Sequence, residues 1–500
     1  MSASGSRTSP GNRVATAVVD RFPARLIIGG EATDGQAGRV FSVTNPATEA
    51  EIATVAEGDE GDIDRAVRSA RTTFESESWR AISARQRGEM LYRLGELIQK
   101  NRDELARLET LNNGKPLFES QIDVKLTAET FRYYAGWADK VHGETIPVDG
   151  PFFNYTLREP LGVVGAIVPW NFPMSLAAWK VAPAIACGNT VILKPASETP
   201  FTALRMAELA LEAGVPAGVF NCVPGRGAVA GNALVEHPEV DKIAFTGSTD
   251  VGKEVMRRAA GSVKRISLEL GGKSPNIVFA DADLDAAARG ALTGIFYGKG
   301  EVCAAGSRLL VEEPVRQELR AKIVERARKM VAGDPLHPKT RLGALVSQRQ
   351  MERVLGFIDI ANREGATLIA GGERTRVDGK GFFVQPTIFD DVTRDMTIAR
   401  EEIFGPVLAM MSFTGGMEGA AELANATIYG LAAGIWTRDI KKALRTARAV
   451  KAGTVWINSY NVYDAAAPFG GYKQSGFGRE LGMYAIDGYT QVKSVWVDLS

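Results

Sequence analysis

The chain has 500 residues, enough for two to four domains, and its 45% hydrophobic and 24% charged residues are typical of a folded protein. Lysine plus arginine and aspartate plus glutamate both total 59, so the formal net charge is zero and no overall field attracts phosphate backbones or anionic lipid. These values exclude a single small module and a mainly disordered chain, and we expect neither nucleic-acid nor membrane partners.

Cysteine and histidine are both scarce, with three of each. Cys187, Cys222 and Cys303 form neither a disulfide framework nor a CxxC pattern, which favours a reducing compartment and a cytoplasmic location. The sequence has no HExxH motif and no Cys/His cluster. We therefore expect no metal site.

A tail and a block of helices are predicted at the start of the chain. Residues 1–20 are rich in Ser, Gly, Thr and Arg and lack the apolar core of a secretory signal, so we interpret them as a flexible tail. Over residues 62–138, apolar side chains recur at steps of three and four, which predicts helices. Ser83 and Gln86 have the spacing of a capping box at one helix start.

A parallel sheet is predicted next. Short β-rich runs alternate with amphipathic runs, which is typical of strands joined by crossover helices. Helices are predicted at 201–213 and 251–260, each followed by glycine. Strands are predicted at 162–168, 190–193, 219–223, 242–245 and 265–268. The pattern indicates a doubly wound α/β sheet.

The second half of the chain repeats the α/β alternation. A strand is predicted at 276–279, a helix at 284–295, a strand around Leu309 and Leu310, and a helix at 317–331. We interpret this as a second α/β domain. At the end of the chain, residues 491–497 form a strand candidate, and the segment 144–157 is its candidate partner.

Five notable loops follow the five strand candidates of the first sheet. They are PWNFP at 169–173, KPAS at 194–197, GRGAVAG at 225–231, TGST at 246–249 and ELGG at 269–272. Ligands of open α/β sheets bind outside the carboxyl ends of the strands. Because all five loops fall on that edge, the sequence predicts a ligand site there.

The glycines of these loops do not by themselves define a nucleotide site. Gly225, Gly227 and Gly231 give GxGxxxG, which differs from the common dinucleotide fingerprint. Gly247 and Gly252 flank a Ser-Thr pair before a helix, which suits either a pyrophosphate at the helix N-terminus or an ordinary capped turn. Their place at the sheet edge favours the pyrophosphate.

Four side chains have both a chemical and a structural interpretation. Cys303 lies in GKGEVCAAGS; a lone cysteine is usually a core residue, but this glycine-rich loop suits a nucleophile. Glu269, flanked by leucines, is either a base with a raised pKa or an ion-pair partner. Asn171 is either an oxyanion donor or a turn residue. Lys194 is either a ligand of ribose or phosphate or a solvated lysine.

Taken in order, the motifs resemble the aldehyde dehydrogenase superfamily over nearly the whole chain after the tail. The segments that carry the resemblance are PWNFP, KPAS, FTGST, LELGG, GEVCAAGSR, EEIFGPV at 401–407 and PFGGYKQSGFGRE at 468–480. Several motifs in one order make the resemblance far more specific than a single glycine pattern.

The resemblance implies oxidation of an aldehyde to the carboxylic acid with NAD or NADP, through a thiohemiacetal and a thioester on Cys303. It implies that Glu269 is the general base and that Asn171 and the backbone N–H of Cys303 form the oxyanion hole. The candidate cofactor residues are Trp170, Lys194, Ser197, Glu198, Gly227, Gly231, Gly247, Ser248, Glu402 and Phe404.

Two positions depart from the family pattern. Many members have Gln where this chain has Glu301. Ser197 stands where NAD-preferring relatives commonly carry a glutamate that binds both ribose hydroxyls. A carboxylate there repels a 2′-phosphate and a serine does not, so we predict that NADP is accepted at least as readily as in typical NAD enzymes. Because Glu198 is the next residue along the chain, NAD also remains a candidate cofactor.

The substrate and the assembly are also expectations from the family. Phe172, Leu176, Trp179, Val302 and Tyr463 are predicted to line the aldehyde tunnel. The tunnel has no obvious arginine, which favours an uncharged aldehyde or a cationic aminoaldehyde over an acid semialdehyde.

The resemblance also suggests domain boundaries. We expect a dinucleotide-binding domain at 21–140 and 161–271, a catalytic domain at 272–480, and a β oligomerisation arm at 141–160 and 486–500. A homodimer or homotetramer is expected.

Three other functions remain open. The first is a non-catalytic protein with the same fold, which the joint presence of Cys303, Glu269, Asn171 and Lys194 disfavours. The second is an acylating dehydrogenase that passes the acyl group to coenzyme A instead of water, which Glu269 disfavours. The third is a cysteine protease, which lacks a placed histidine.

Overall fold

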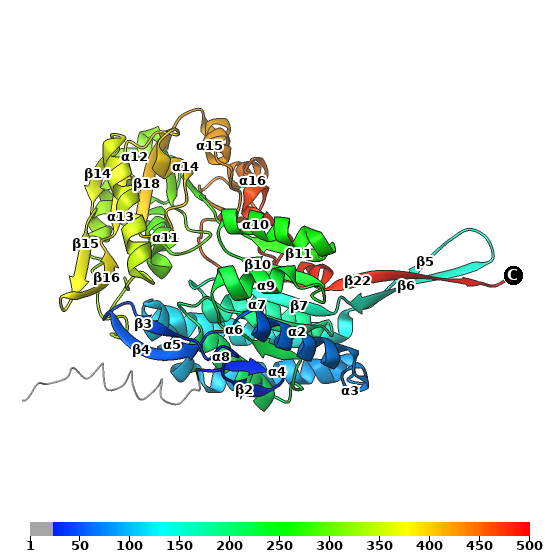
Figure 1. Ribbon diagram of the computed structural model, residues 1–500. Helices are drawn as coiled ribbons and strands as arrows, with labels where there is room; N and C mark the ends of the chain where they lie inside the picture. Colours follow the sequence, from blue (N-terminus) through cyan, green and yellow to red (C-terminus); the bar gives the residue numbers. More distant parts are fainter. Residues whose placement is uncertain (1–23) are drawn as a thin grey trace, which may run out of the picture.

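The computed structural model describes residues 24–500, so the predicted tail at 1–20 lies outside the described residues. The described chain forms two α/β lobes and a β-arm that projects from the first lobe (Figure 1). Over this part of the chain, the structure contains no helix that is both long enough and apolar enough to span a bilayer.

The first lobe is built on an eight-stranded sheet in the order β2-β1-β9-β8-β7-β10-β11-β21. Its five central strands are parallel and follow the order of a doubly wound dinucleotide-binding half, with the switch point between β7 and β10. The bounds are β1 Leu26–Ile28, β2 Glu31–Thr33, β7 Val163–Ile167, β8 Thr190–Lys194, β9 Phe220–Cys222, β10 Lys242–Thr246, β11 Arg265–Glu269 and β21 Gly476–Phe477. All five predicted strands are present, with ends shifted by one residue or less.

Helices cover this sheet on both faces, so β7, β8, β9 and β10 are buried along their whole length. In β7, Val164 and Ala166 pack into one core cluster, and Val163 and Ile167 pack into another on the opposite face. The helices are α2 Glu60–Glu75, α3 Glu77–Arg80, α4 Ala84–Lys100, α5 Arg102–Asn113, α6 Leu117–Trp137, α7 Pro173–Ala186, α8 Phe201–Glu212, α9 Asn232–Glu236 and α10 Thr249–Ala259. The predicted capping box of Ser83 and Gln86 is present at the start of α4.

The second lobe contains a seven-stranded sheet in the order β14-β17-β18-β13-β12-β19-β20, parallel except for the edge strand β14. The strands are β12 Pro275–Val278, β13 Arg308–Glu312, β14 Thr367–Ala370, β17 Thr387–Asp390, β18 Val407–Phe413, β19 Ala432–Trp436 and β20 Thr454–Ile457. The helices are α11 Leu284–Phe296, α12 Arg316–Ala327, α13 Gln348–Arg363, α14 Thr397–Arg400, α15 Gly416–Asn425 and α16 Ile440–Ala449. The predicted second α/β domain is therefore present, and the helix predicted to reach residue 331 ends at Ala327.

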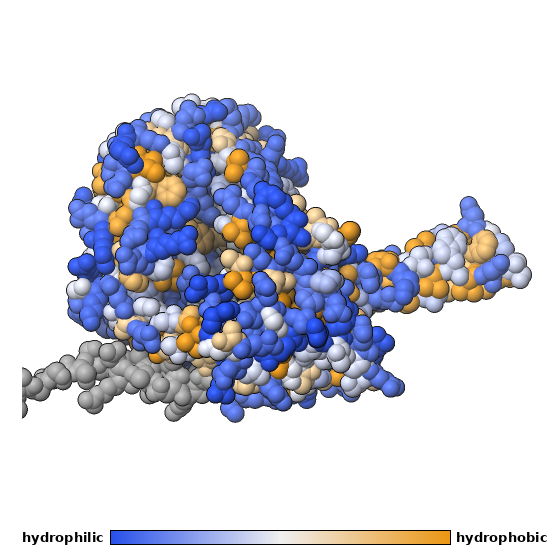
Figure 2. Space-filling model, in the orientation of Figure 1, coloured by the Kyte–Doolittle hydropathy of each residue, from blue (hydrophilic) through white to orange (hydrophobic). Residues whose placement is uncertain are grey.

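Two hairpins and the arm complete the fold. The hairpins are β3 Val40–Asn45 with β4 Ala50–Ala56, and β15 Arg374–Val377 with β16 Lys380–Val384. The arm consists of β5 Thr145–Ile146, β6 Phe152–Pro160 and β22 Thr490–Asp498, and β22 pairs with β6 as the sequence predicted. It extends away from the body of the molecule with apolar side chains on its surface (Figure 2).

The chain crosses between the lobes near its end. β21 lies within the range 272–480 that we expected to belong to the second domain, but it pairs antiparallel with β11 of the first sheet. The backbone N–H of Leu270 also donates to the carbonyl of Ser475. The segment that follows the second sheet therefore returns to the first lobe before residue 480.

Candidate active site

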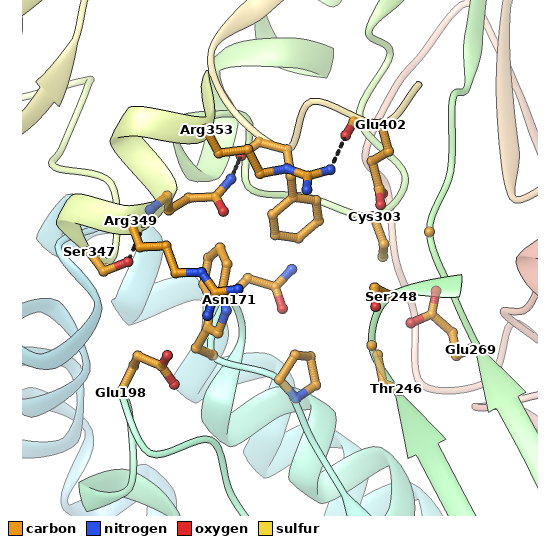
Figure 3. Close-up of a pocket in the computed structure, with 16 residues that line it drawn as sticks. Asn171, Glu198, Thr246, Ser248, Glu269, Cys303, Ser347, Arg349, Arg353 and Glu402 are labelled. Carbon is orange, nitrogen blue, oxygen red and sulfur yellow. Dashed lines mark hydrogen bonds between the residues drawn. The ribbon is translucent and has the colours of Figure 1, made fainter. Parts of the chain in front are cut away.

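A cavity of about 420 Å³ lies between the lobes, at the carboxyl ends of β7, β10 and β11 (Figure 3). This volume falls in the range of small-molecule sites. The cavity is lined by Pro169, Trp170, Asn171, Glu198, Thr246, Gly247, Ser248, Glu269, Gly271, Cys303, Ser347, Arg349, Gln350, Arg353, Glu402 and Phe404. Three of the five predicted loops contribute to it, at 169–173, 246–249 and 269–272, and all three predicted catalytic side chains line it.

The first lobe supplies one wall from loops at its switch point. Each loop leaves the sheet where a parallel strand ends, so the fixed register of the strands brings the loops together. Ser248 is the N-cap of α10 and accepts from the backbone N–H of Val251, which leaves the start of this helix beside the cavity. Backbone N–H groups at such a helix start favour an anionic group.

The second lobe supplies the opposite wall. Cys303 follows α11, and Figure 3 shows it between Glu402 on one side and Ser248 and Glu269 on the other. Glu402 accepts from the backbone N–H of Gly272 at 2.9 Å. Phe404 has a φ of 60°, which is uncommon for a residue other than glycine. Its ring lies edge-on to Trp170, with 5.2 Å between the ring centroids, so the two walls touch at this end of the cavity.

The carboxylate of Glu269 is buried, with 2% exposure. Neither of its oxygens has a hydrogen-bond partner among the described residues. Burial, and then the nearby charge of Glu480, raise the pKa of Glu269 to about 8. Burial and the negative charge of Glu269 raise the pKa of the Cys303 thiol well above its ordinary value. Within residues 24–500, Glu269 forms no ion pair, which was the structural alternative considered above.

The side chain of Asn171 points into the cavity (Figure 3), and a hydrogen bond to the loop before Cys303 holds it in place. Its Nδ2 donates to the carbonyl of Glu301 at 2.9 Å, and its Oδ1 is buried without a partner among residues 24–500. An amide NH₂ carries two hydrogens. One therefore fixes the side chain to the loop before Cys303, and the second is available for a bound oxygen atom.

Lys194, Ser197, Gly227 and Gly231 do not line the cavity, although they lie beside it. The Nζ of Lys194 donates to the carbonyls of Pro195 and Gly225 at 2.7 and 3.1 Å, and the hydroxyl of Ser197 donates to the same Gly225 carbonyl at 3.2 Å. Lys194 is 4% exposed, so a solvated lysine is excluded. Gly227–Gly231 forms a helical turn that continues into α9, where we had interpreted a loop.

This set of groups fits a nicotinamide dinucleotide. The start of α10 suits a pyrophosphate, while Glu198 and Glu402 offer carboxylates to ribose hydroxyls. Lys194 uses two of its three N–H groups on protein carbonyls and retains the third. Among residues 24–500, no group of three or more His, Cys, Asp and Glu side chains is arranged to hold a metal ion.

The residues predicted to line the aldehyde tunnel lie outside the lining of this cavity, and three of them are aromatic: Phe172, Trp179 and Tyr463. The ring of Tyr463 lies 6.2 Å from that of Trp179, and the ring of Phe172 stacks on Tyr297 at 6.4 Å. Leu176 and Val302 are buried, with 3% and 4% exposure. Phe172, Cys303 and Tyr463 pack against the same apolar core.

The sequence analysis missed two groups of residues. Ser347, Arg349, Gln350 and Arg353 line the cavity from the start of α13, and no strand-end pattern marked them. Lys180 lies fully buried within α7, where it pairs with Glu480 and donates to Thr246 at 2.7 Å. The sequence could have pointed to Lys180, because it is the first charged residue after the uncharged stretch 161–179.

The strand order of the first lobe and the position of the cavity at its switch point define a dinucleotide-dependent enzyme. The sequence matches the aldehyde dehydrogenase family over residues 32–495. Aldehyde dehydrogenase 1A1 of Gallus gallus is 50% identical over 480 residues, which are 95% of this chain and 93% of the relative. Retinal dehydrogenase 2 of Homo sapiens is 49% identical over 478 residues, 95% of this chain and 92% of the relative.

Solved structures give the same result. The NAD⁺ complex of an aldehyde dehydrogenase from Bacillus cereus matches with a TM-score of 0.95 at 49% identity, and the match covers 99% of both chains. The chain therefore belongs to the aldehyde dehydrogenase family. The predicted α/β fold, the oxidation of an aldehyde and the use of a nicotinamide cofactor are confirmed.

Proposed function

We propose that this enzyme oxidises its aldehyde through a covalent thioester on Cys303, with Glu269 as general base and Asn171 in the oxyanion hole. The observation that carries the proposal is that these three side chains line one cavity together with Trp170 and Phe404. A scaffold without catalysis has no use for a buried carboxylate that lacks hydrogen-bond partners beside a thiol.

The chemistry begins with addition of the Cys303 sulfur to the carbonyl carbon of the aldehyde. The carbonyl oxygen becomes an alkoxide, which the free N–H of Asn171 and the backbone N–H of Cys303 stabilise. Bound NAD(P) serves as the acceptor of the hydride that leaves the former aldehyde carbon. The acyl group then remains on the sulfur as a thioester.

Glu269 completes the turnover in this proposal. Its carboxylate takes a proton from water, the hydroxide adds to the thioester, and the acid leaves as sulfur is released. Because burial raises the pKa of Glu269 to about 8, the group is a stronger base than an ordinary carboxylate near neutral pH.

We further propose that NADP is accepted at least as readily as in typical NAD enzymes. Ser197 has no charge to repel a 2′-phosphate, and its hydroxyl is held by the carbonyl of Gly225. The proposed cofactor ligands include Lys194, Glu198, Gly227 and Gly231 near this end and Glu402 at the other. The ratio of kcat/KM for the two cofactors tests the proposal, and a strong preference for NAD would overturn it.

The proposed substrate is an uncharged aliphatic or aromatic aldehyde, or a cationic aminoaldehyde. The aromatic cluster of Phe172, Trp179 and Tyr463, with Leu176 and Val302, supports this class because aromatic faces attract both apolar groups and cations. A panel of aldehydes that includes acid semialdehydes tests it. Higher kcat/KM for the acidic members than for neutral ones of equal length would contradict it.

We also propose that the enzyme is a cytoplasmic homodimer or homotetramer, with a dinucleotide-binding domain at 21–140 and 161–271, a catalytic domain that begins at 272 and ends before β21, and an arm at 141–160 and 486–500. The arm supports self-association because it exposes large apolar side chains, including Phe152 at 42% and Trp496 at 59%. Three free cysteines suit a reducing compartment. Light scattering coupled to size-exclusion chromatography gives the mass of the assembly.

The test of the main proposal compares Cys303→Ala with Cys187→Ala as a matched control. Both substitutions remove a thiol, but Cys187 is buried at the end of α7, away from the cavity lining. We expect no NAD(P)H formation above background for Cys303→Ala and activity near that of the parent for Cys187→Ala. Products analysed with and without coenzyme A separate hydrolysis from acyl transfer. Activity that survives Cys303→Ala would contradict the nucleophile.

A further inference from the structure

A buried ion pair lies behind the cavity, in the loop that leads to Cys303. The Nζ of Lys299 is 2.8 Å from a carboxylate oxygen of Glu301, and both residues are 1% exposed. Gly298, Lys299 and Gly300 have φ angles of 57°, 62° and 73°, so three successive residues are in the left-handed region. That conformation is unfavourable for lysine. The contacts of its side chain must therefore hold the loop in this shape.

The cation reaches the turn that carries Asn171. The Nζ of Lys299 donates to the side-chain oxygen and to the backbone carbonyl of Asn113, at 2.6 and 3.1 Å. The Nδ2 of Asn113 in turn donates to the carbonyl of Trp170 at 2.7 Å. One ammonium group thus connects the loop before the thiol to the residue that precedes Asn171.

The carboxylate of Glu301 contacts a residue just before α13, and its backbone carbonyl contacts the oxyanion side chain. Glu301 accepts from the backbone N–H of Val346 at 3.0 Å, and Val346 precedes the N-cap of α13, Ser347. The backbone carbonyl of Glu301 accepts from Asn171 at 2.9 Å. The same residue therefore contacts both walls of the cavity, although its own side chain does not line it.

α13 extends the connection to the cofactor side. The Nε2 of Gln350 donates to the carbonyl of Phe404 at 2.7 Å, and Arg353 donates to the carbonyl of Glu402 at 3.0 Å. The start of α13 therefore holds the backbone of Glu402 and Phe404, and Glu301 holds the start of α13.

From these contacts we propose that Lys299 and Glu301 are a positioning pair that aligns the Cys303 loop with Asn171 and with the Glu402–Phe404 segment. The proposal rests on the roles proposed above for Cys303 and Asn171. Neither member touches the reacting atoms. Loss of one charge leaves the other buried without its ion-pair partner, and the more distant charges of Glu119 and Lys115 remain near it. The loop then has to move, and small displacements of a reacting group lower the rate steeply.

The test is a double-mutant cycle with Lys299→Gln, Glu301→Gln and the double variant. Each single variant leaves one uncompensated buried charge, whereas the double variant leaves two neutral amides that can still hydrogen-bond. We expect kcat of each single variant to fall on the order of 10²-fold and the double variant to recover to within about tenfold of the parent.

Two readouts that do not depend on turnover accompany the cycle. The first is the rate at which iodoacetamide alkylates Cys303, and the second is the affinity for NAD from quenching of protein fluorescence. We expect both to change in the single variants and to return toward parental values in the double variant. The matched control is Asp390→Asn, which breaks the buried Arg316–Asp390 ion pair of the second lobe, whose N–O distance is 2.9 Å. It should lower Tm and leave both readouts unchanged.

Two results would overturn the proposal. One is a set of single variants that lose only Tm, with kcat, alkylation and NAD affinity like those of Asp390→Asn. The other is a double variant no better than the single ones. Either result leaves the proposed chemistry intact as long as Cys303→Ala is inactive. Conversely, an active Cys303→Ala variant would contradict the proposed function, whatever the result of the double-mutant cycle.

Discussion

The two walls of the cavity are built in different ways. The first-lobe wall consists of short loops after parallel strands that are buried on both faces, so the sheet topology alone brings Asn171, Ser248 and Glu269 together. The second-lobe wall carries Cys303 and Phe404 on irregular backbone, which is held by buried charges and amides. Substitutions on the first wall should therefore change single chemical steps, and those behind the second wall should change the alignment of several groups at once.

The largest effect on the first wall is expected for Glu269→Gln. Without a base, hydrolysis of the thioester should slow by about 10²- to 10⁴-fold. Hydride transfer precedes that step, so a rapid burst of about one NADH per active site should remain. Stopped-flow absorbance separates burst from steady state. A steady-state rate like that of the parent would show that Glu269 is not the base.

A somewhat smaller effect is expected for Asn171→Ala, which removes one oxyanion donor. The value of kcat should fall on the order of 10²–10³-fold, and the burst should slow as well, since the alkoxide forms before hydride transfer. The matched control is Asn154→Ala in the arm, where a buried asparagine donates to Ser494 far from the cavity. Equal losses in the two variants would mean that the effect of Asn171 is structural.

The next effect in size, a change of about tenfold in kcat/KM for NADP, is expected for Ser197→Glu. A carboxylate at this position repels the 2′-phosphate of NADP, so kcat/KM for NADP should fall at least about tenfold while that for NAD is maintained or improved. Ser197→Ala adds no charge and should keep the parental cofactor ratio. If both variants change the ratio equally, the charge argument fails.

The smallest effect is a shift in the pH dependence of Cys303, and it measures how strongly the two walls interact. The charge of Glu269 raises the pKa of the thiol, because a nearby negative charge disfavours the thiolate. Glu269→Gln removes that charge, so the midpoint of the alkylation rate of Cys303 against pH should move to lower pH. Burial still acts on the thiol, so the midpoint should stay above the ordinary value. An unchanged or higher midpoint would contradict the account.

Local patterns predicted most of the first wall, whereas on the second wall the sequence analysis named Cys303, Glu402 and Phe404 and missed the start of α13. The strands of the first sheet, the capping box of Ser83 and Gln86 and the strand at the end of the chain are local patterns, and all are present in the structure. The start of α13 reaches the cavity only because two lobes pack together, which no local pattern encodes. The role of Glu301 depends on contacts with Val346 and Asn171, at sequence separations of 45 and 130 residues.

Some residues were assigned from the family and still lack a direct structural argument. Gly227 and Gly231 form a helical turn beside Lys194 and do not line the cavity. Phe172, Leu176, Trp179 and Tyr463 share one apolar core with Cys303, and their contact with an aldehyde stays a prediction.

The central claim is a thioester on Cys303, and peptide mass spectrometry tests it most directly. Glu269→Gln is mixed with aldehyde and NAD, quenched in acid within the burst, and digested. The account predicts an added acyl mass on the peptide that contains Cys303, removable by hydroxylamine, and none on the peptides that contain Cys187 or Cys222. A burst of NADH with an unmodified Cys303, or with the acyl mass on another residue, would contradict it.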